Sequence, residues 1–362
     1  MRWSGKEFPN NTKMISYLKM QLSSLSLGEL NSENVMAIAD AKTALDRVLA
    51  LEEQYWWQRS RVQWLKTGDK NSRFFHASTI SRRQRNRILS IKDDSGNWLL
   101  EKEAITNNIA SFFQNLFASS NPNDLSSVLS YVDNRISDNM NQLLMRPVTK
   151  EEVKQAAFSL EGSKALGPDG FLRMFYHNTW TETGESIFNM VQEFFAGKVS
   201  LGSINANTVT LIPKTDKPDH VCQYHPIGLC NFSYKIISKL MANRLRPLLD
   251  HCISQNQGAF VPGRSIQDNI IIAHEVYHYL QRKRTSRKYE FALKMDMSKA
   301  YDCIEWKFLE EVLLRFGFYA DWVSLVMNCV KSVRLTFCLS DDALLYMNAS
   351  RVNCRHLARI LN

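Results

Sequence analysis

Apolar residues recur every three or four positions in several stretches of the chain, the spacing that lines one face of an α-helix. The longest such stretch spans 32–66, with Asn31 or Ser32 as a possible N-cap and Gly68 as a possible stop. Thr149 followed by Glu152 is a capping-box pattern at the start of another helix. The same spacing predicts shorter helices at about 72–83, 101–118, 149–161, 235–249, 268–281, 306–316 and 322–331.

Short apolar runs bounded by turn residues predict strands. Residues 88–100 contain two such runs around a turn at 93–96, which is the pattern of a β-hairpin. Residues 209–212 and 291–295 each predict a single strand. A second hairpin is predicted over 333–347, with its turn at 340–342.

The chain of 362 residues exceeds the usual limit for a single hydrophobic core, which favours two domains. Residues 119–147 are rich in Ser, Asn, Asp and Pro at both ends, so a linker is predicted there. It would separate a mainly helical region, 1–118, from a mixed region, 148–362. The expected fold class is therefore α+β.

The formal net charge of +9 is concentrated in one segment. Between 59 and 87, one acidic residue stands against nine basic ones: Arg59, Arg61, Lys66, Lys70, Arg73, Arg82, Arg83, Arg85 and Arg87. Aromatic residues such as Trp64, Phe74 and Phe75 interleave with them. Rings that stack on bases, beside cations that follow phosphates, are typical of binding to single-stranded nucleic acid. The alternative is a pair of packed helices with buried rings and solvated charges.

The sequence gives little sign of export or of a membrane. No apolar run approaches the length of about 20 residues that spans a bilayer, and the N-terminus lacks the apolar core of a signal peptide. The seven cysteines are scattered without a C-x-x-C pair, which favours reduced thiols and an intracellular location, in the nucleus or the cytoplasm.

Three carboxylates are the strongest candidates for chemistry. Asp296 follows an apolar strand, and Asp341 and Asp342 occupy the turn of a predicted hairpin. If these elements are neighbours in one sheet, the carboxylates converge and can hold two Mg²⁺ ions for phosphoryl transfer. Turn chemistry alone also explains an Asp-Asp pair, as it does at Asp93 and Asp94.

The segment 291–302 (FALKMDMSKAYD) resembles motif A of the reverse transcriptases of non-LTR (LINE-type) retrotransposons, especially those of plant genomes. Further segments resemble the same family in the same order, and the resemblance runs from about residue 50 to the C-terminus. They are 64–76 (WLKTGDKNSRFFH), 164–171 (KALGPDGF), 211–214 (LIPK), 226–239 (PIGLCNFSYKIISK) and 257–264 (QGAFVPGR), followed by Asp268 and Asn269.

The resemblance implies fingers and a partial palm of a right-hand polymerase, with an RNA template, a DNA primer and deoxynucleotides as partners and two Mg²⁺ (or Mn²⁺) as cofactors. Asp296 matches the metal-binding aspartate of motif A, and Asp341 and Asp342 match the metal-binding pair of motif C. Tyr301 matches the gate that rejects a ribose 2′-hydroxyl. Lys214 matches a fingers lysine near the triphosphate.

The same resemblance implies roles for two further residues. Arg264 matches a position that can contact template or nucleotide, although a surface arginine is the simpler alternative. His225 stands where the family has an arginine that grips the triphosphate. A largely neutral imidazole lacks the forked donors for that grip.

Other departures concern whole segments. Leu166 replaces a proline in the 164–171 loop. The QGDPLSP segment of motif B, with its helix, is absent between the strand near 333–337 and the motif C hairpin. Compared with the family pattern, we also expect most of the thumb to be missing, and we expect no endonuclease domain upstream of the basic region.

We therefore expect an RNA-directed DNA polymerase of this family that is weakly active or inactive. A non-catalytic RNA-binding remnant acting through 59–87 is the alternative. A decayed sequence with an uncovered sheet face is a third possibility.

Overall fold

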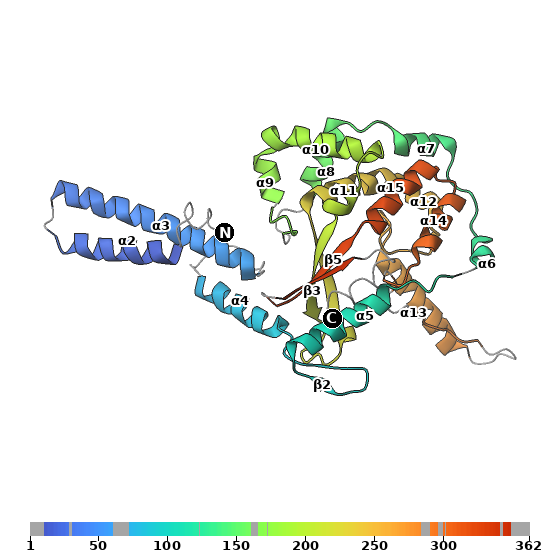
Figure 1. Cartoon of the computed structure of the whole chain (residues 1–362), viewed down its shortest axis with the longest axis horizontal. Helices are drawn as coiled ribbons and strands as arrows, with labels where there is room; N and C mark the ends of the chain where they lie inside the picture. The colour runs from blue at the N-terminus through green and yellow to red at the C-terminus, as the bar shows by residue number, and fades with distance from the viewer. Residues whose placement is uncertain are drawn as a thin grey trace. The chain divides into compact units, whose positions relative to one another are not determined.

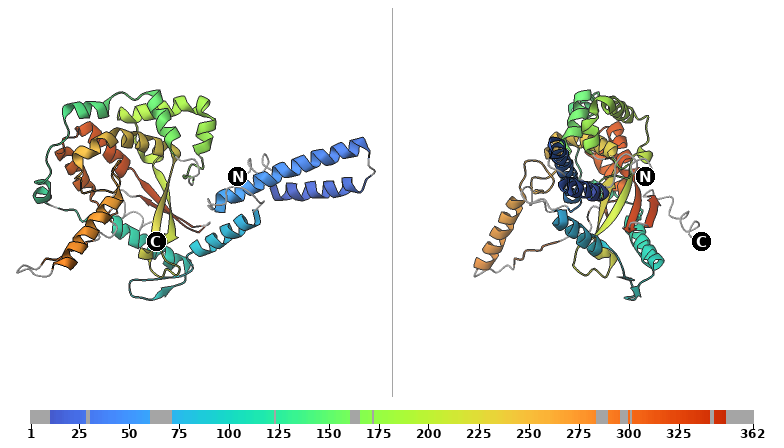
Figure 2. Two further views of the ribbon diagram at one scale, coloured as in Figure 1. Left: turned by 180° about the vertical axis from the view of Figure 1, so that it is seen from behind. Right: turned by 90° about the vertical axis from the view of Figure 1, so that its left-hand side faces the viewer.

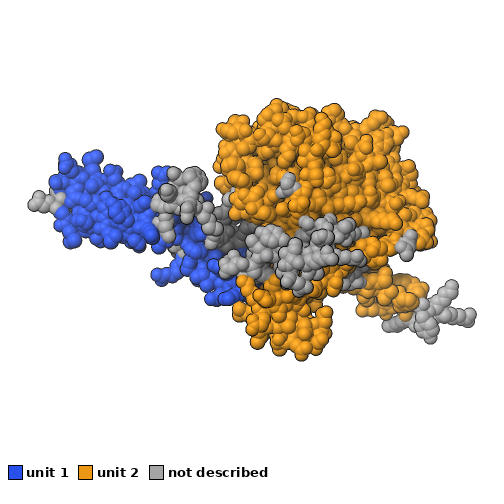
Figure 3. All heavy atoms as spheres, viewed as in Figure 1, with its two compact units in different colours: residues 1–87 blue, residues 88–362 orange. Residues whose placement is uncertain are grey.

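The computed structural model describes residues 11–28, 31–60, 72–122, 124–160, 166–171, 173–283, 290–295, 300, 302–340 and 343–348. The chain divides into two compact units, Met1–Arg87 (unit 1) and Ile88–Asn362 (unit 2), which Figure 3 colours separately. This division differs from the linker predicted at 119–147. The helices and strands are labelled in Figure 1, and a second pair of views is given in Figure 2.

Unit 1 is helical, as the sequence predicts. Its helices are α2 (Asn11–Ser26), α3 (Ser32–Ser60) and α4 (Ser72–Asn86). The side-chain oxygen of Asn31 accepts a hydrogen bond from the Asn34 amide at 2.7 Å, so Asn31 caps α3. Helices α2 and α3 lie side by side as a helical hairpin (Figures 1 and 2). The ring of Trp56 meets His76 of α4 edge-on at 4.2 Å, and Phe75 is buried.

Unit 2 is built on a four-stranded sheet in the order β4-β3-β5-β6. Strand β3 pairs antiparallel with β4 and parallel with β5, while β5 and β6 form the predicted antiparallel hairpin. The strands are β3 (Ala206–Pro213), β4 (Tyr224–Cys230), β5 (Arg334–Ser340) and β6 (Ala343–Asn348). The strand predicted at 209–212 is confirmed and is longer than expected.

The strand predicted at 291–295 is wrong. These residues have no regular secondary structure and belong to neither sheet of the described structure, and Phe291 and Met295 are more than 80% exposed. Alternation of apolar and polar residues is a local signal, whereas a strand needs a partner whose backbone is unpaired. The edge of β3 that is not paired with β4 is paired with β5.

One face of the sheet is covered by the elements that begin unit 2. The first predicted hairpin is present as β1 (Ile91–Lys92) and β2 (Trp98–Leu99), and α5 (Lys102–Phe117) follows it. Val209 and Leu211 of β3 pack into one buried cluster with Phe113 of α5 and Phe337 of β5, whose rings lie 4.6 Å apart. The sheet therefore depends on residues upstream of the expected polymerase region.

A second, larger core holds the helices of unit 2 together. Buried residues from several helices share it, among them Val153, Val191, Ile236 and Trp322. The helices are α6 (Ser126–Leu129), α7 (Asp138–Met145), α8 (Lys150–Ser159), α9 (Arg173–Asn178), α10 (Trp180–Phe195), α11 (Phe232–Leu245), α12 (Leu249–Cys252), α13 (Ile266–Arg282), α14 (Trp306–Arg315) and α15 (Ala320–Lys331). Short 3₁₀ turns span Leu201–Ser203, Val221–Gln223 and Arg246–Leu248.

The segment 119–147 is packed on unit 2. The amide of Asn141 donates to the Gly317 carbonyl at 2.7 Å, and its oxygen accepts from the Tyr319 amide at 2.9 Å. The hydroxyls of Ser119 and Ser120 donate to the Glu305 carboxylate. These bonds tie the polar segment to the residue before α14 and to the turn between α14 and α15, so its polar composition reflects specific hydrogen bonds rather than a solvated linker.

A buried ion pair joins α8 to α11. The guanidinium of Arg244 donates to both oxygens of Glu152, at 2.8 and 2.7 Å, and also to the carbonyls of Leu144 and Arg146. Thr149 accepts from the Glu152 amide, as the capping pattern predicts, but the Glu152 carboxylate binds Arg244. Burial raises the pKa of Glu152, yet the hydrogen bonds from Arg244 and Arg146 outweigh it and lower the pKa overall.

Substituting Arg244→Met is expected to destabilise unit 2 by about 3–5 kcal/mol, because the partly buried Glu152 carboxylate loses two charge-assisted bonds and keeps only Arg146, and the Leu144 and Arg146 carbonyls lose this donor. Urea unfolding of the full chain followed by circular dichroism measures the change. Arg246→Met, at an exposed position two residues on, is the control and should change the free energy of unfolding by less than about 0.5 kcal/mol. Equal effects would contradict the assignment.

Candidate nucleotide and nucleic-acid sites

The three aspartates predicted to bind metal are not among the described residues. Asp296, Asp341 and Asp342 lie outside the described residues, as does Tyr301. Ser340 pairs with Ala343 across the β5–β6 hairpin, which is the context predicted for the Asp-Asp turn. Within the described ranges, no group of three or more His, Cys, Asp or Glu side chains could hold a metal. Convergence of the three aspartates therefore stays a prediction.

Lys214 directly follows β3 and is held by the loop that leads into β4. Its amide donates to the Gln223 carbonyl at 2.8 Å, and its ammonium donates to the Cys222 carbonyl at 3.1 Å. A carbonyl is uncharged, so this bond orients the ammonium without neutralising it. The lysine thus keeps the positive charge that a phosphate group would need.

His225 is exposed on the sheet face opposite to α5. It pairs with Ile212, and residues directly opposite in a ladder point to the same side. Val209 and Leu211 point to the buried cluster, so Ile212 and His225 point away from it. His225 therefore lies on a half-buried face where a ligand has access.

The loop between β3 and β4 contains an ion pair that the sequence did not reveal. The ammonium of Lys92, on β1, lies 2.8 Å from Asp219 and 4.9 Å from the centre of the Trp98 ring. The Lys92 amide also donates to the Asp219 carbonyl at 2.7 Å. His220 Nδ1 lies 2.9 Å from the second oxygen of Asp219. The partners Lys92 and Asp219 are 127 positions apart, so no local pattern could have indicated them.

Hydrogen bonds from Lys92 and His220 hold the pKa of Asp219 well below its ordinary value. A carboxylate with a lowered pKa stabilises the folded state fully above its ordinary pKa of about 3.9. The contribution is lost as the pH falls through the lowered value. At neutral pH the pair is therefore intact.

Two of the motif segments meet in the structure. The Asp169 amide donates to the side-chain oxygen of Asn231, and the Asn231 amide group donates to the Ile204 carbonyl, both at 3.1 Å. A Cβ on Gly167 would lie 2.6 Å from the Cys230 carbonyl oxygen and 2.7 Å from the Asn231 backbone. Glycine at 167 is therefore required by close backbone approach.

Arg264 has a structural role in the loop that precedes α13. Its guanidinium donates to Asp250 at 2.8 Å and to the carbonyls of Ser254, Gln257 and Ile253. Only 15% of the side chain is exposed. This geometry favours neither a template contact nor the simple surface arginine considered as its alternative.

The basic segment is described in part. Arg61, Lys66 and Lys70 lie outside the described residues, and Arg59 is in the last turn of α3. The rest are exposed, on α4 or just after it: Arg73, Arg82, Arg83, Arg85 and Arg87. Helix α4 contains no acidic residue. A helix with several exposed cations and no carboxylate suits a polyanion.

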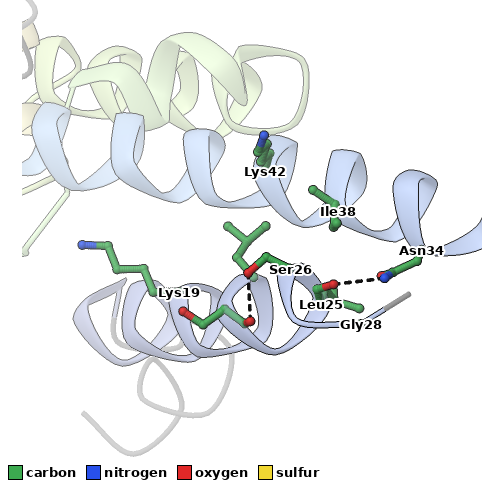
Figure 4. Close-up of a pocket in the computed structure, with 9 residues that line it drawn as sticks. Lys19, Leu25, Ser26, Gly28, Asn34, Ile38 and Lys42 are labelled. Atoms are coloured by element: carbon green, nitrogen blue, oxygen red, sulfur yellow. Dashed lines mark hydrogen bonds between the residues drawn. The ribbon is translucent and has the colours of Figure 1, made fainter. Parts of the chain in front are cut away.

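Two cavities lie apart from these residues. The larger, about 680 Å³, is in unit 1 between α2 and α3, where Lys19 and Lys42 border an apolar floor that includes Ile38 (Figure 4). The amide of Asn34 donates to the Leu25 carbonyl at its edge. The smaller, about 190 Å³, is in unit 2 between the end of α5 and residues 302–306. Its lining combines apolar side chains with Asp302 and Glu305.

Comparison with known proteins gives two findings. Residues 212–349 match the family described as "Reverse transcriptase (RNA-dependent DNA polymerase)". The chain is also 29% identical over 287 residues to "Transposon TX1 uncharacterized 149 kDa protein" of Xenopus laevis. That alignment covers 78% of this chain and 22% of the relative, so the chain spans about a fifth of the relative's length.

Gly167→Ala is expected to destabilise unit 2 by about 1–3 kcal/mol, because its methyl group would overlap backbone atoms that cannot move independently. Gly228→Ala is the matched control, since a Cβ there meets no atom within 4 Å. Urea unfolding of both variants measures the difference. A Gly167→Ala protein as stable as Gly228→Ala would show that the loop is not docked on Asn231.

Proposed function

Starting from the membership of residues 212–349 in the reverse transcriptase family, we propose that this chain is part of the RNA-directed DNA polymerase of a LINE-type, non-LTR retrotransposon. The observation that carries the proposal is the arrangement around β3 and β4. Lys214 follows β3, His225 lies on β4, and the Gly167 loop docks at the end of β4. Lys214 and His225, which the resemblance assigns to the triphosphate, thereby lie on or next to one pair of strands, beside a third segment of the same family pattern.

The reverse transcriptase family acts on a nucleic-acid template and nucleotides and generally uses divalent metal ions. For this chain we assign the metal-ligand role to Asp296, Asp341 and Asp342, whose hard oxygens suit two Mg²⁺ or Mn²⁺ ions. Such ions would stabilise the charge that develops on the attacking 3′-hydroxyl and the leaving pyrophosphate. Tyr301 is assigned as the sugar gate and Lys214 as the triphosphate contact.

Three features of the chain lead us to expect a weak polymerase activity. His225 replaces a bidentate arginine, and the motif B segment is missing between β5 and the hairpin turn. The segment 291–295, which leads into Asp296, is not paired with the sheet that carries the β5–β6 hairpin. We therefore expect Asp296 to be poorly preorganised for two ions, because it follows a described segment that is not paired with that sheet.

Primer extension on poly(rA)/oligo(dT) with Mg²⁺ or Mn²⁺ tests the proposal. We expect incorporation by the full chain at a rate at least about a hundredfold below that of an intact reverse transcriptase, because the loss of one preorganised group costs about 10²–10³ in rate. His225→Arg should raise the rate by supplying the missing forked donor.

Asp296→Ala is the control, and it should abolish whatever incorporation the chain shows. Incorporation that survives this substitution would rule out the metal assignment. A folded chain with no incorporation under either metal, even with His225→Arg, would leave RNA binding as its retained activity.

A second candidate function is RNA binding by α4 without catalysis. The exposed arginines of a helix without carboxylates favour it. Binding of this kind is dominated by the release of counterions from phosphates and is therefore steeply dependent on salt.

Binding of single-stranded RNA by the full chain, titrated at several salt concentrations, tests this role. The triple variant Arg82→Gln, Arg83→Gln and Arg85→Gln should lower the salt slope by about 2, since each phosphate contact contributes about 0.7 for a single strand. A charge-matched variant, Lys13→Gln with Lys19→Gln and Lys42→Gln, removes exposed lysines from α2 and α3 instead. If both variants reduce the slope equally, α4 is not the binding surface.

A further inference from the structure

We propose that Lys92 and Asp219 form a positioning pair that sets the loop 214–223, and through it the ammonium of Lys214, to receive a triphosphate. The inference rests on the proposed function for the identity of the ligand. The pair itself and the loop that it holds are independent of that function.

The first step is the clamp between the β1–β2 hairpin and the loop. Lys92 makes two bonds to one residue of the loop, from its amide to the Asp219 carbonyl and from its ammonium to the Asp219 carboxylate. The Trp98 ring below the ammonium restricts its direction. The hairpin is anchored in turn because Ile91 is fully buried against β3 and α5.

The second step carries this restraint from Asp219 to Lys214. The Asp219 amide donates to the side-chain oxygen of Gln223 at 2.7 Å. The carbonyl of Gln223 accepts the Lys214 amide, and the neighbouring carbonyl of Cys222 accepts the Lys214 ammonium. A continuous chain of hydrogen bonds therefore runs from Lys92 to both ends of Lys214.

The third step is electrostatic. Asp219 is a carboxylate within a loop that would have to accept an anion. Lys92 neutralises it by a direct ion pair, while Lys214 is held by uncharged carbonyls and keeps its own charge. Removing Lys92 would leave the Asp219 carboxylate with His220 as its remaining side-chain partner, and a negative charge that has lost its ammonium opposes binding of a phosphate.

The experiment measures binding of inorganic tripolyphosphate to the full chain by calorimetry. Lys92→Met is expected to weaken binding about fivefold, and Lys214→Met about tenfold or more, the loss that about one charge-assisted hydrogen bond produces. Lys331→Met, which removes an ion pair with Glu310 at a partly exposed position, is the matched control and should bind as the unmodified chain does.

Amide hydrogen exchange without ligand is the second readout. Lys92→Met should speed exchange at the Lys214 and Asp219 amides, whereas Lys331→Met should not. Unchanged exchange and unchanged binding in Lys92→Met would overturn the inference.

Altered exchange in Lys92→Met, combined with normal binding in Lys214→Met, would instead remove Lys214 from the proposed nucleotide site. The binding half of the inference would be overturned with it, and the clamp on the loop would stand. Failure of the positioning pair and failure of the proposed function thus give different results.

Discussion

The pairing of β3 on both of its edges is the constraint on which unit 2 depends. One edge takes β4 and the other takes β5, although β5 begins more than a hundred positions further along the chain. Because β3 is held between two neighbouring strands, its side chains alternate between the two faces of the sheet. Val209 and Leu211 bury themselves against α5, and Ile212 points to the opposite face with His225. Burial of the apolar face against α5 therefore determines which face of the sheet stays accessible.

The elements upstream of the sheet are part of it in physical terms. Ile91 and Phe113 lie in the same buried cluster as the β3 and β5 residues, and Lys92 reaches the loop between β3 and β4. Hydrophobic burial supplies non-directional attachment, while the Lys92–Asp219 pair supplies direction. The β1–β2 hairpin is too small to be stable alone, but once packed on the sheet it restrains the loop that carries Lys214.

Other parts of unit 2 expose apolar residues to an unusual degree. Helix α13 is amphipathic but has no buried residue, and Phe291 and Met295 follow it with most of their surface exposed. The resemblance implies that a motif B helix is absent, and a helix packed beside the sheet would offer such residues a partner. A match of residues 212–349 to a polymerase family and a fully assembled polymerase site are therefore separate matters for this chain.

The sequence by itself determined most of the longer helices, the two hairpins and the β3 strand, because hydrophobic spacing and turn chemistry are local. It did not predict α2, α7, α9 or α10, and it left the cap of α3 open between Asn31 and Ser32. It also indicated the family, through motifs whose residues are contiguous. Only the tertiary structure decided that 291–295 is unpaired and that 119–147 packs on α14 and α15. The tertiary structure likewise revealed the roles of Arg244 and Lys92. Their partners are 92 and 127 positions away, so their hydrogen bonds depend on how the chain folds back on itself.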